Sequence, residues 1–307
     1  MDANARPTSF DVTLPGDGAA GRWTHLRNED EHTADLIELG VPETVAEALA
    51  VTAARPRASR FDGGLVLVLR GVNMSPGAEP EDMVSVRMWV KGEHIVTVSP
   101  RRVFAVEDVH AAIGTPEGPR TPSEVVALLA ETLVERITPF VDKLMDEVER
   151  IEERVIETEL DELQAPLSQL RRVVAQIRRH LAPQRDALAR LYREPPAVLR
   201  AQDVEAVREV GDRTQRNVED LDAIRERALV LRDELDHHAS AALNRNTYLM
   251  SVVAAVFLPL SLITGVLGIN VGGIPGTDSP VAFAIVVVGL LVLTGLELWL
   301  LRRLRII

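Results

Sequence analysis

The hydrophobic pattern is most uniform toward the C-terminal end of the chain. No Asp, Glu, Lys or Arg occurs between Arg245 and Asp278, and none occurs between Asp278 and Glu297. The hydrocarbon core of a bilayer is about 30 Å thick and is spanned by about 20 apolar helical residues. The pattern therefore predicts two transmembrane helices, the first at about 247–269 and the second at 280–301.

A short loop, residues 270–279, joins the two predicted helices, and a basic tail, residues 302–307, follows them. Basic residues are enriched at the cytoplasmic ends of membrane helices. Arg245 precedes the first helix, and the loop has no Lys or Arg. Three arginines follow the second helix: Arg302, Arg303 and Arg305. The sequence thus predicts that both termini are cytoplasmic and that the loop faces the periplasm.

The N-terminal region, residues 1–120, has the short mixed elements of an α+β domain. Apolar runs and alternating positions predict five strands, at 22–26, 65–69, 84–90, 95–98 and 103–106. Two helices are predicted between the first two strands, at 30–39 and 43–52. Residues 1–20 are polar and rich in Gly, and they predict no element.

From residue 121 the apolar period changes to three or four residues, which is typical of amphipathic helices. Residues 121–196 are predicted to form two antiparallel cytosolic helices, with Pro139 bending the first and Pro183 interrupting the second. A third helix, residues 197–269, is predicted to continue as a stalk into the first membrane span. A helix of about 70 residues is about 105 Å long. Its narrow apolar stripe requires neighbouring helices, and further copies of the chain are the simplest source.

The predicted fold class is an α+β cytosolic domain followed by long stalk helices and an all-α two-span transmembrane hairpin. The 307 residues carry a net charge of −12, which argues against nucleic acid as a partner. The lack of cysteine excludes disulfides and cysteine-ligated metals, and no secretory signal is visible near the N-terminus. No catalytic triad, phosphate-binding Gly loop or metal-hydrolase spacing occurs, so neither enzyme activity nor a cofactor is expected.

Small and weakly polar residues form one helical stripe on the first span. Their spacing of three, four or seven residues places them on one face. In lipid such residues face protein or water rather than acyl chains. The stripe is either a packing face for another helix or the lining of a pore formed by several copies around an axis. Its members are Asn244, Thr247, Ser251, Leu258, Ser261 and Gly265.

The turn after the first span carries Gly268, Ile269 and Asn270. Gly268 allows backbone conformations closed to other residues. Copies of Asn270 around an axis would make a ring of carboxamide oxygens, which suits a cation that keeps much of its hydration shell. The alternative role for Asn270 is to cap a tight turn. Asp278 is the one carboxylate in the loop, and it is a weaker candidate for attracting metal ions.

Two further groups are candidates for metal binding in the cytosolic part. His237 and His238 precede the first span, and neutral imidazole is a good zinc ligand. Adjacent residues point about 100° apart on a helix, so only one of the two can face an axis, and solvated surface histidine is the alternative. An acidic run can concentrate cations or can form a solvated helix face. It comprises Glu147, Glu149, Glu152, Glu153, Glu157, Glu159, Asp161 and Glu162.

These features resemble a known family. The segment 248–276, which contains the Gly-Ile-Asn turn, is similar to the signature of CorA-type two-span metal ion transporters. Ile269 in the middle of the turn and the Gly-Gly-Ile-Pro run at 272–275 resemble the ZntB-like zinc transporter branch, as does the stretch 70–89. The resemblance extends over nearly the whole chain from about Trp23.

The resemblance implies a funnel-shaped homopentamer in which the first span of each subunit lines a central pore and the second span packs outside it. The family's Gly-x-Asn signature maps onto the Gly-Ile-Asn turn at the periplasmic mouth. The implied function is divalent cation transport across the bacterial inner membrane, zinc first, with proton coupling allowed. Leu258 is the expected hydrophobic constriction. The family's pore-facing positions fall on Asn244, Thr247, Leu258, Ser261 and Gly265.

Two alternatives stay open. The first is a magnesium or cobalt transporter of the CorA type, although the CorA branch carries acidic residues after its Asn where this loop has only Asp278. The second is a non-conducting metal sensor or scaffold anchored in the membrane, which would need neither the stripe nor the Gly-Ile-Asn turn. The expected partners are further copies of the chain, membrane lipid and divalent cations.

Overall fold

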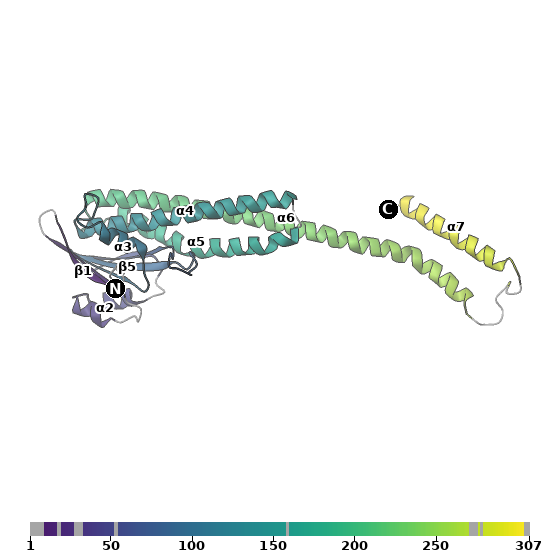
Figure 1. Ribbon diagram of the computed structural model, residues 1–307, viewed down its shortest axis with the longest axis horizontal. Coiled ribbons are helices and arrows are strands. Elements are labelled where there is room, and N and C mark those ends of the chain that lie inside the picture. Colours follow the sequence, from purple (N-terminus) through teal and green to yellow (C-terminus); the bar gives the residue numbers. More distant parts are fainter. Residues whose placement is uncertain are drawn as a thin grey trace, which may run out of the picture. The chain divides into compact units, whose positions relative to one another are not determined.

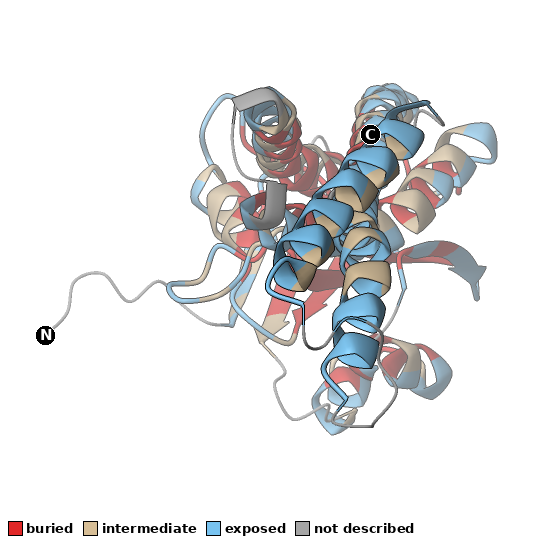
Figure 2. Cartoon of the chain, turned by 90° about the vertical axis from the view of Figure 1, so that its right-hand side faces the viewer, coloured by how far each residue is buried: buried red, intermediate tan, exposed pale blue. Residues whose placement is uncertain are grey.

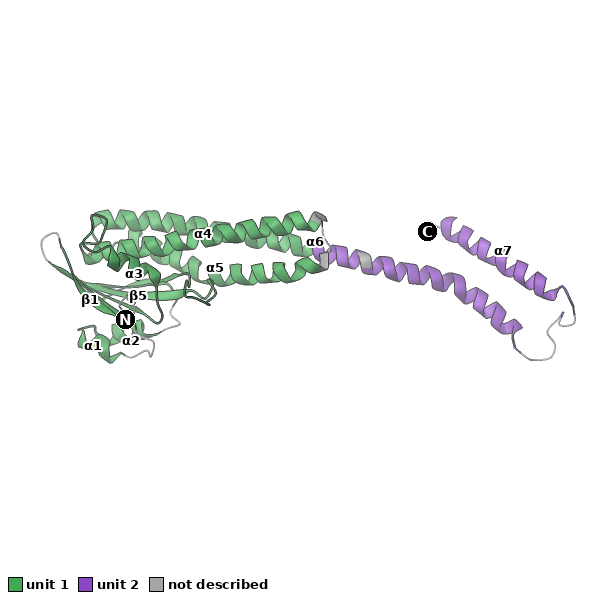
Figure 3. Cartoon of the chain, viewed as in Figure 1, with its two compact units in different colours: residues 1–233 green, residues 234–307 purple. Residues whose placement is uncertain are grey.

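The computed structural model describes residues 9–16, 20–27, 33–51, 55–157, 160–269, 276 and 279–303. Its contacts divide the chain into two compact units, Met1–Asp233 and Glu234–Ile307 (Figure 3). The first unit contains a mixed sheet and a helical bundle, and the second contains two long apolar helical segments. The sheet, the long helices and the two apolar helices confirm the predicted fold class.

The sheet has six strands in the order β1-β2-β6-β5-β4-β3. Neighbouring strands are antiparallel except β2 and β6, which run parallel with Trp23 opposite Ile95. The strands are β1 (Phe10–Leu14), β2 (Gly21–Arg27), β3 (Arg57–Phe61), β4 (Gly64–Gly71), β5 (Val84–Lys91) and β6 (His94–Ser99).

Strands β4 and β5 are buried on both faces, which explains the nearly continuous apolar sequence of β4, whereas β5 also buries Ser85 and Arg87. Successive residues of a strand point to opposite faces. The alternating residues from Val84 to Val90 all enter the core shared with the long helices, as the pattern predicts. Trp89 points the other way and packs with α1 (Ala34–Glu38) and α2 (Glu43–Ala50), which cover the opposite side of the sheet (Figure 1).

Long helices cover the first face of the sheet (Figure 1). They are α4 (Pro122–Glu157), α5 (Gln164–Arg193) and the N-terminal part of α6 (Ala201–Leu267), with the shorter α3 (Phe104–Ala111). A 3-10 turn, η1 (Leu160–Leu163), contacts α4 and α5. Polar contacts cross the bundle: Arg178 Nε donates to Asp222 Oδ1 at 2.5 Å, and Asn217 Nδ2 donates to Thr138 Oγ1 at 3.1 Å. These contacts are only partly buried, whereas the apolar seam between the helices contains many fully buried side chains, so the seam dominates the stability of the bundle.

Residues 103–106 begin a helix, so the prediction of a strand there was wrong. Val103 is extended at the N-cap position, and α3 follows directly. Ala105, Val106 and Val109 are buried at helical spacing. A run of four apolar residues cannot by itself distinguish a strand from a buried helix.

The prediction that Pro183 interrupts the second long helix was also wrong, because α5 continues through it. Leu181 and Gln184 on either side are fully buried. Gln184 Oε1 also accepts a hydrogen bond of 2.6 Å from the backbone N–H of Arg70. These tertiary contacts hold the helix despite the backbone hydrogen bond that proline cannot make. Helix α4 likewise continues through Pro139.

The sheet has two edge strands, β1 and β3, that the sequence did not predict. In β3, which reads Arg-Ala-Ser-Arg-Phe, only Ala58 is buried. Edge strands are often short and polar because one side of their backbone is not paired within the sheet. They therefore carry little of the periodic signal on which a prediction depends.

The second unit contains the C-terminal part of α6 and all of α7 (Ala282–Arg303). The most apolar window of each helix has no buried residue. Figure 2 shows α7, which leads to the C-terminal label, in the exposed and intermediate colours. A helix of 22 residues is about 33 Å long, enough to cross the hydrocarbon core. An exposed apolar surface of this extent requires lipid or further protein around it.

Leu129 is fully buried in the core that α4 shares with the sheet. Its replacement by Ala leaves a cavity, a change that costs about 2–5 kcal/mol. We expect Leu129→Ala to lower the unfolding temperature of the detergent-solubilised chain by several degrees. Ile37→Ala, at a side chain that is 44% exposed, is the control and should change the free energy of unfolding by no more than about 0.5 kcal/mol. Equal effects of the two substitutions would contradict the assigned core.

His25 is buried on β2, with Nδ1 2.8 Å from Thr97 Oγ1. Burial, and to a lesser extent the charge of His110, lowers the pKa of His25 to about 4. The pKa of histidine in the unfolded chain is about 6.5. The stability that neutral His25 contributes is therefore complete above pH 6.5 and is lost as the pH falls toward 4, a difference of about 3 kcal/mol.

We accordingly expect His25→Gln to flatten the decline in unfolding temperature between pH 6.5 and pH 4, a range defined by the two pKa values. His238→Gln, at an exposed position, should leave the wild-type decline unchanged. Thermal unfolding at a series of pH values measures both. A decline as steep in His25→Gln as in the wild type would show that this imidazole is not the group that titrates.

Candidate functional site

The predicted stripe lies on a single unbroken helix. Helix α6 runs without interruption from Asn244 through Gly265, so the period of 3.6 residues is kept. At about 100° per residue, the six stripe positions fall within an arc of about 100°. All six are exposed in the isolated chain. The structure therefore brings the predicted residues together on one side of α6.

The same side of α6 also contains Leu262, which was not predicted. Leu262 lies four residues after Leu258, so the two side chains occupy adjacent turns. Their exposed fractions are 69% and 68%. The helical period alone would have found Leu262. Together the two leucines form an apolar band across an otherwise small and polar face, the kind of band that excludes water when copies meet at an axis.

Two hydroxyl groups of this segment bond to their own helix. Ser251 Oγ donates to the Thr247 carbonyl at 2.9 Å, and Thr264 Oγ1 donates to the Leu260 carbonyl at 3.0 Å. A hydroxyl has one donor hydrogen and two acceptor lone pairs. Because the hydrogen is directed at the backbone, the remaining lone pairs can accept from water or face a cation.

Helix α6 ends at Leu267, directly before the predicted turn. The Gly268 N–H donates to the Thr264 carbonyl at 2.9 Å and so closes the last helical turn. Gly268 does not adopt a left-handed conformation, so it does not use the wider conformational freedom that glycine allows. A Cβ at this position would lie 3.2 Å from the Thr264 oxygen, which is a tight contact. Glycine therefore fits here because of close packing at the helix end.

The remaining loop residues are only partly described. Ile269 follows the helix and is 51% exposed. Asn270 and Asp278, the predicted metal-facing residues of the loop, lie outside the described residues, as does Arg305 of the tail. Gly276 has a φ of +88°, a left-handed conformation that favours glycine.

Both candidate histidines of the long helix are exposed. By helical spacing His237 lies about 20° from Asn244 at the edge of the stripe, whereas His238 lies about 120° away. Of the two, only His237 shares the stripe's side of α6. Within the described parts of the chain, no three His, Asp or Glu side chains converge in a way that could hold a metal ion.

The predicted acidic run is largely neutralised where its side chains are described. Arg227 pairs with Glu149 at 3.2 Å and also with Glu152, which lowers the pKa of the Glu152 carboxyl through the hydrogen bond that it accepts. Arg150 pairs with Glu147. These contacts favour an ion-paired helix surface over a site that collects cations.

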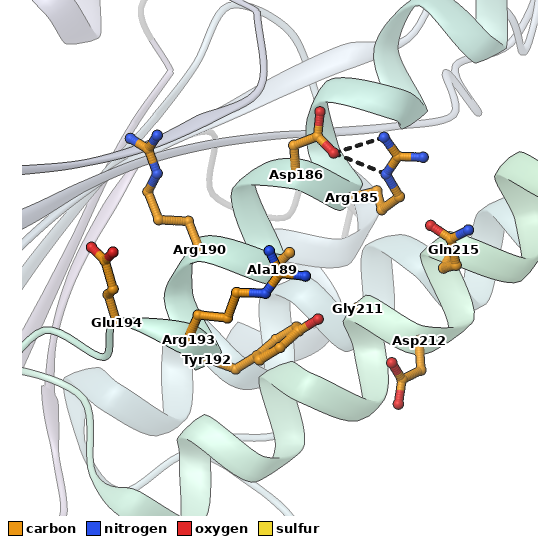
Figure 4. Close-up of a pocket in the computed structure, with 10 residues that line it drawn as sticks. All are labelled: Arg185, Asp186, Ala189, Arg190, Tyr192, Arg193, Glu194, Gly211, Asp212 and Gln215. Carbon is orange, nitrogen blue, oxygen red and sulfur yellow. Dashed lines mark hydrogen bonds and ion pairs between the residues drawn. The ribbon is translucent and has the colours of Figure 1, made fainter.

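A pocket of about 620 Å³ lies between α5 and α6 in the first unit (Figure 4). Arg190, Tyr192 and Arg193 of α5 face it, and Arg185 bonds to the neighbouring Asp186. None of the predicted site residues lines it. A second pocket, of about 420 Å³, contains His180 and three arginines, and it was not predicted either. Its residues come from positions too far apart in the sequence to form a motif.

Comparison with known proteins relates the whole chain to one group. The family profile described as "CorA-like Mg2+ transporter protein" matches residues 18–303. The zinc transport protein ZntB of Pectobacterium atrosepticum is 32% identical over 283 residues, which cover 92% of this chain and 86% of that protein. The divalent cation transporter CmaX of Pseudomonas aeruginosa is 38% identical over 287 residues, again covering 92% and 86%. These relatives are ion transporters and not enzymes.

Solved structures agree with this assignment. The structure of full-length CmaX has a TM-score of 0.81 at 33% identity and covers 98% of this chain and 99% of that one. The CorA magnesium transporter from Methanocaldococcus jannaschii has a TM-score of 0.79 at 16% identity, covering 97% and 99%, a likeness of fold alone. The family match over most of the sequence shows that this chain belongs to the CorA family of metal ion transporters.

Proposed function

We propose that this chain transports zinc across the bacterial inner membrane through the central pore of a homopentamer. Membership in the CorA family makes it a transporter of divalent cations. The observation that carries the proposal is the stripe of small and polar residues on one exposed side of an unbroken α6, ending at the Gly-Ile-Asn turn.

Oligomer formation is supported by the surface of the second unit. The apolar window of α6 has no buried residue, and the stripe interrupts it with groups that lipid does not solvate well. Copies arranged around an axis would place the stripe toward water and the remaining apolar surface toward α7 and lipid. Closed rotational symmetry is the usual form of such assemblies, and the number five follows from the family resemblance.

The proposed orientation has both termini in the cytoplasm and the loop in the periplasm. Arg302 and Arg303 end α7, and basic residues favour the cytoplasmic side. The Arg303 guanidinium lies 5.3 Å from the centre of the Trp299 ring. Trp and Arg are both enriched at the membrane–water interface, where a cation above the ring is stabilised.

The proposed path begins at the periplasmic turn. A hydrated cation meets the ring of Asn270 carboxamides, whose neutral oxygens bind it weakly enough for release. It then passes the small residues of the stripe and the apolar band of Leu258 and Leu262, which acts as the constriction. Thr247 and Asn244 supply oxygens beyond the band, and His237 lies further along the same side.

Zinc is preferred here because several relatives at 30–34% identity are named zinc transport proteins. The stripe and turn supply neutral oxygen ligands, which do not by themselves discriminate zinc from magnesium. The match to CmaX, named for divalent cations generally, keeps a magnesium or cobalt transporter as the second candidate. Proton coupling is a further part of the proposal, and it requires that a pH gradient changes zinc flux.

Asn270→Ala should reduce zinc uptake into proteoliposomes to background, because the ring of carboxamide oxygens at the mouth is removed. Size-exclusion chromatography should show the same assembly as the wild type. Asn246→Ala removes an identical group from the other side of α6 and is the matched control, with uptake expected to remain normal. Uptake would be followed with zinc or magnesium outside, with and without an imposed pH gradient.

Each outcome of this experiment has a definite meaning. Wild-type zinc flux in an assembled Asn270→Ala protein would contradict the role of the ring. Magnesium flux that zinc cannot match would assign the chain to the CorA-type alternative. No flux of either ion from intact wild-type oligomers would favour the metal sensor, and zinc flux indifferent to the pH gradient would exclude proton coupling.

Leu258→Ser should raise the basal flux of cations in the absence of a zinc gradient, because a hydroxyl in the apolar band allows water into the constriction. Val253→Ser lies about 140° from Leu258 around α6 and is the matched control, with no expected rise. Fluorescent detection of ion entry into proteoliposomes measures the leak. An equal rise in both variants would indicate general damage to the helix rather than opening of a constriction.

A further inference from the structure

The second pocket of the first unit has features that are typical of a ligand-binding site. Its volume of about 420 Å³ falls in the range of small-molecule pockets. Residues from three regions form it: Arg70 at the end of β4, the segment from Glu81 to Ser85 that leads into β5, and Gln176, Arg179 and His180 of α5. Arg101, just after β6, completes the wall. All of these elements belong to the same sheet and bundle.

The charges in this pocket are unevenly distributed. The charges of Arg70, Arg179 and Arg55 all act on the His180 imidazole. Glu81 and Asp82 line the same pocket. The His180 end carries an excess of positive charge, although the protein as a whole is strongly acidic.

The arginines of the pocket differ in their contacts. Arg70 Nη1 donates to the Met83 carbonyl at 2.7 Å, and the Arg70 backbone N–H donates to the buried Gln184 side chain. Burial, with Arg179 nearby, lowers the pKa of Arg70. Among the described residues, Arg101 and Arg179 have no hydrogen bond or ion pair to a carboxylate. Two guanidinium groups thus remain available at the pocket wall.

The His180 side chain has a buried polar atom that needs a hydrogen-bond partner. Its Nδ1 is buried and has no hydrogen-bond partner among the described residues. Burial, followed by the charges of Arg70, Arg179 and Arg55, lowers its pKa to about 4, so the ring is neutral at pH 7. A buried polar atom without a partner is costly unless a ligand or water supplies one. An anion in the pocket would offset the arginine charges and accept a hydrogen bond from the protonated imidazole, whose ring must turn to present an N–H to it, because Nδ1 is buried as the ring stands.

We propose that the His180 end of this pocket binds the phosphate group of a small ligand, with Arg70, Arg179 and the His180 imidazole as its donors. Guanidinium groups match tetrahedral oxyanions because each presents several N–H donors in one plane. Glu81 and Asp82, which also line the pocket, can accept hydrogen bonds from hydroxyl or amino groups of an organic phosphate, for which the volume is sufficient. This site is independent of the proposed transport path and requires no metal ion.

Binding should depend on pH in a defined direction. The free pocket holds His180 neutral, whereas the bound anion favours the protonated ring. Binding therefore takes up a proton at pH values between the free and bound pKa, and affinity rises as the pH falls, by up to about tenfold per pH unit. Sulfate is a suitable probe because, unlike phosphate, it does not itself titrate in this range.

The test is titration calorimetry of the full chain in detergent, free of metal and at fixed ionic strength, with sulfate at pH 7.5, 6.5 and 5.5. We expect binding that strengthens toward pH 5.5. Arg179→Gln should weaken it at least about tenfold, the usual effect of losing one charge-assisted contact. Arg172→Gln removes the same charge from an exposed position on the same helix that does not line the pocket, and should bind like the wild type.

His180→Asn separates the proposed role from a merely electrostatic one. It should bind sulfate more weakly and with no dependence on pH, while its unfolding temperature confirms that the chain is folded. Inorganic phosphate and adenosine monophosphate, added in separate titrations, distinguish a free anion from a phosphate carried on an organic group. No sulfate binding by the wild type, or equal binding by the wild type and Arg179→Gln, would overturn the proposal.

Discussion

A backbone that crosses lipid must satisfy its own N–H and C=O groups, and this constraint determines the functional half of the molecule. Only a helix or a closed barrel meets it. Helix α6 meets it over its whole apolar segment, even though Pro259 lies within the helix. Because the helix is not broken, positions three, four and seven residues apart keep a common direction from Asn244 to Gly265. The chemistry of the stripe therefore depends on a property of the backbone rather than on contacts between its side chains.

The same regularity explains what could be predicted from the sequence. The long helices, the two spans and the stripe all repeat a period that is visible in one dimension. The face of β5 that packs on the long helices was predictable for the same reason, since Val84, Val86, Met88 and Val90 recur at every second position and all enter one core, although the strand is buried on both faces. Tertiary contacts overrode the local rule at Pro183, where buried neighbours keep α5 intact. The helix after Val103 was missed because four apolar residues contain too little of either period.

Sites assembled from distant segments leave no such pattern. Arg70 and His180 lie 110 residues apart in the chain, yet both line one pocket. Each arginine there looks like an ordinary surface residue when it is considered alone. Composition even suggests the opposite of a basic site, because the net charge is −12. Within the bundle, by contrast, acidic residues such as Glu149 and Glu152 meet an arginine from α6, so much of the acidic surplus is locally balanced. The charge around a site depends on which residues the folded structure brings together, and this local charge decides what a surface binds.

The parallel pairing of β2 with β6 has a consequence for how the chain is made. Strand β2 cannot complete its hydrogen bonds until β6, about 70 residues later, has left the ribosome. The sheet then still needs the core residues of α4, α5 and α6 up to Val210. All of these precede Asn244, where the stripe begins. The nascent chain can therefore finish its water-soluble core before its first membrane-spanning segment emerges, so that folding and insertion become successive steps of synthesis and do not compete for the same apolar surface.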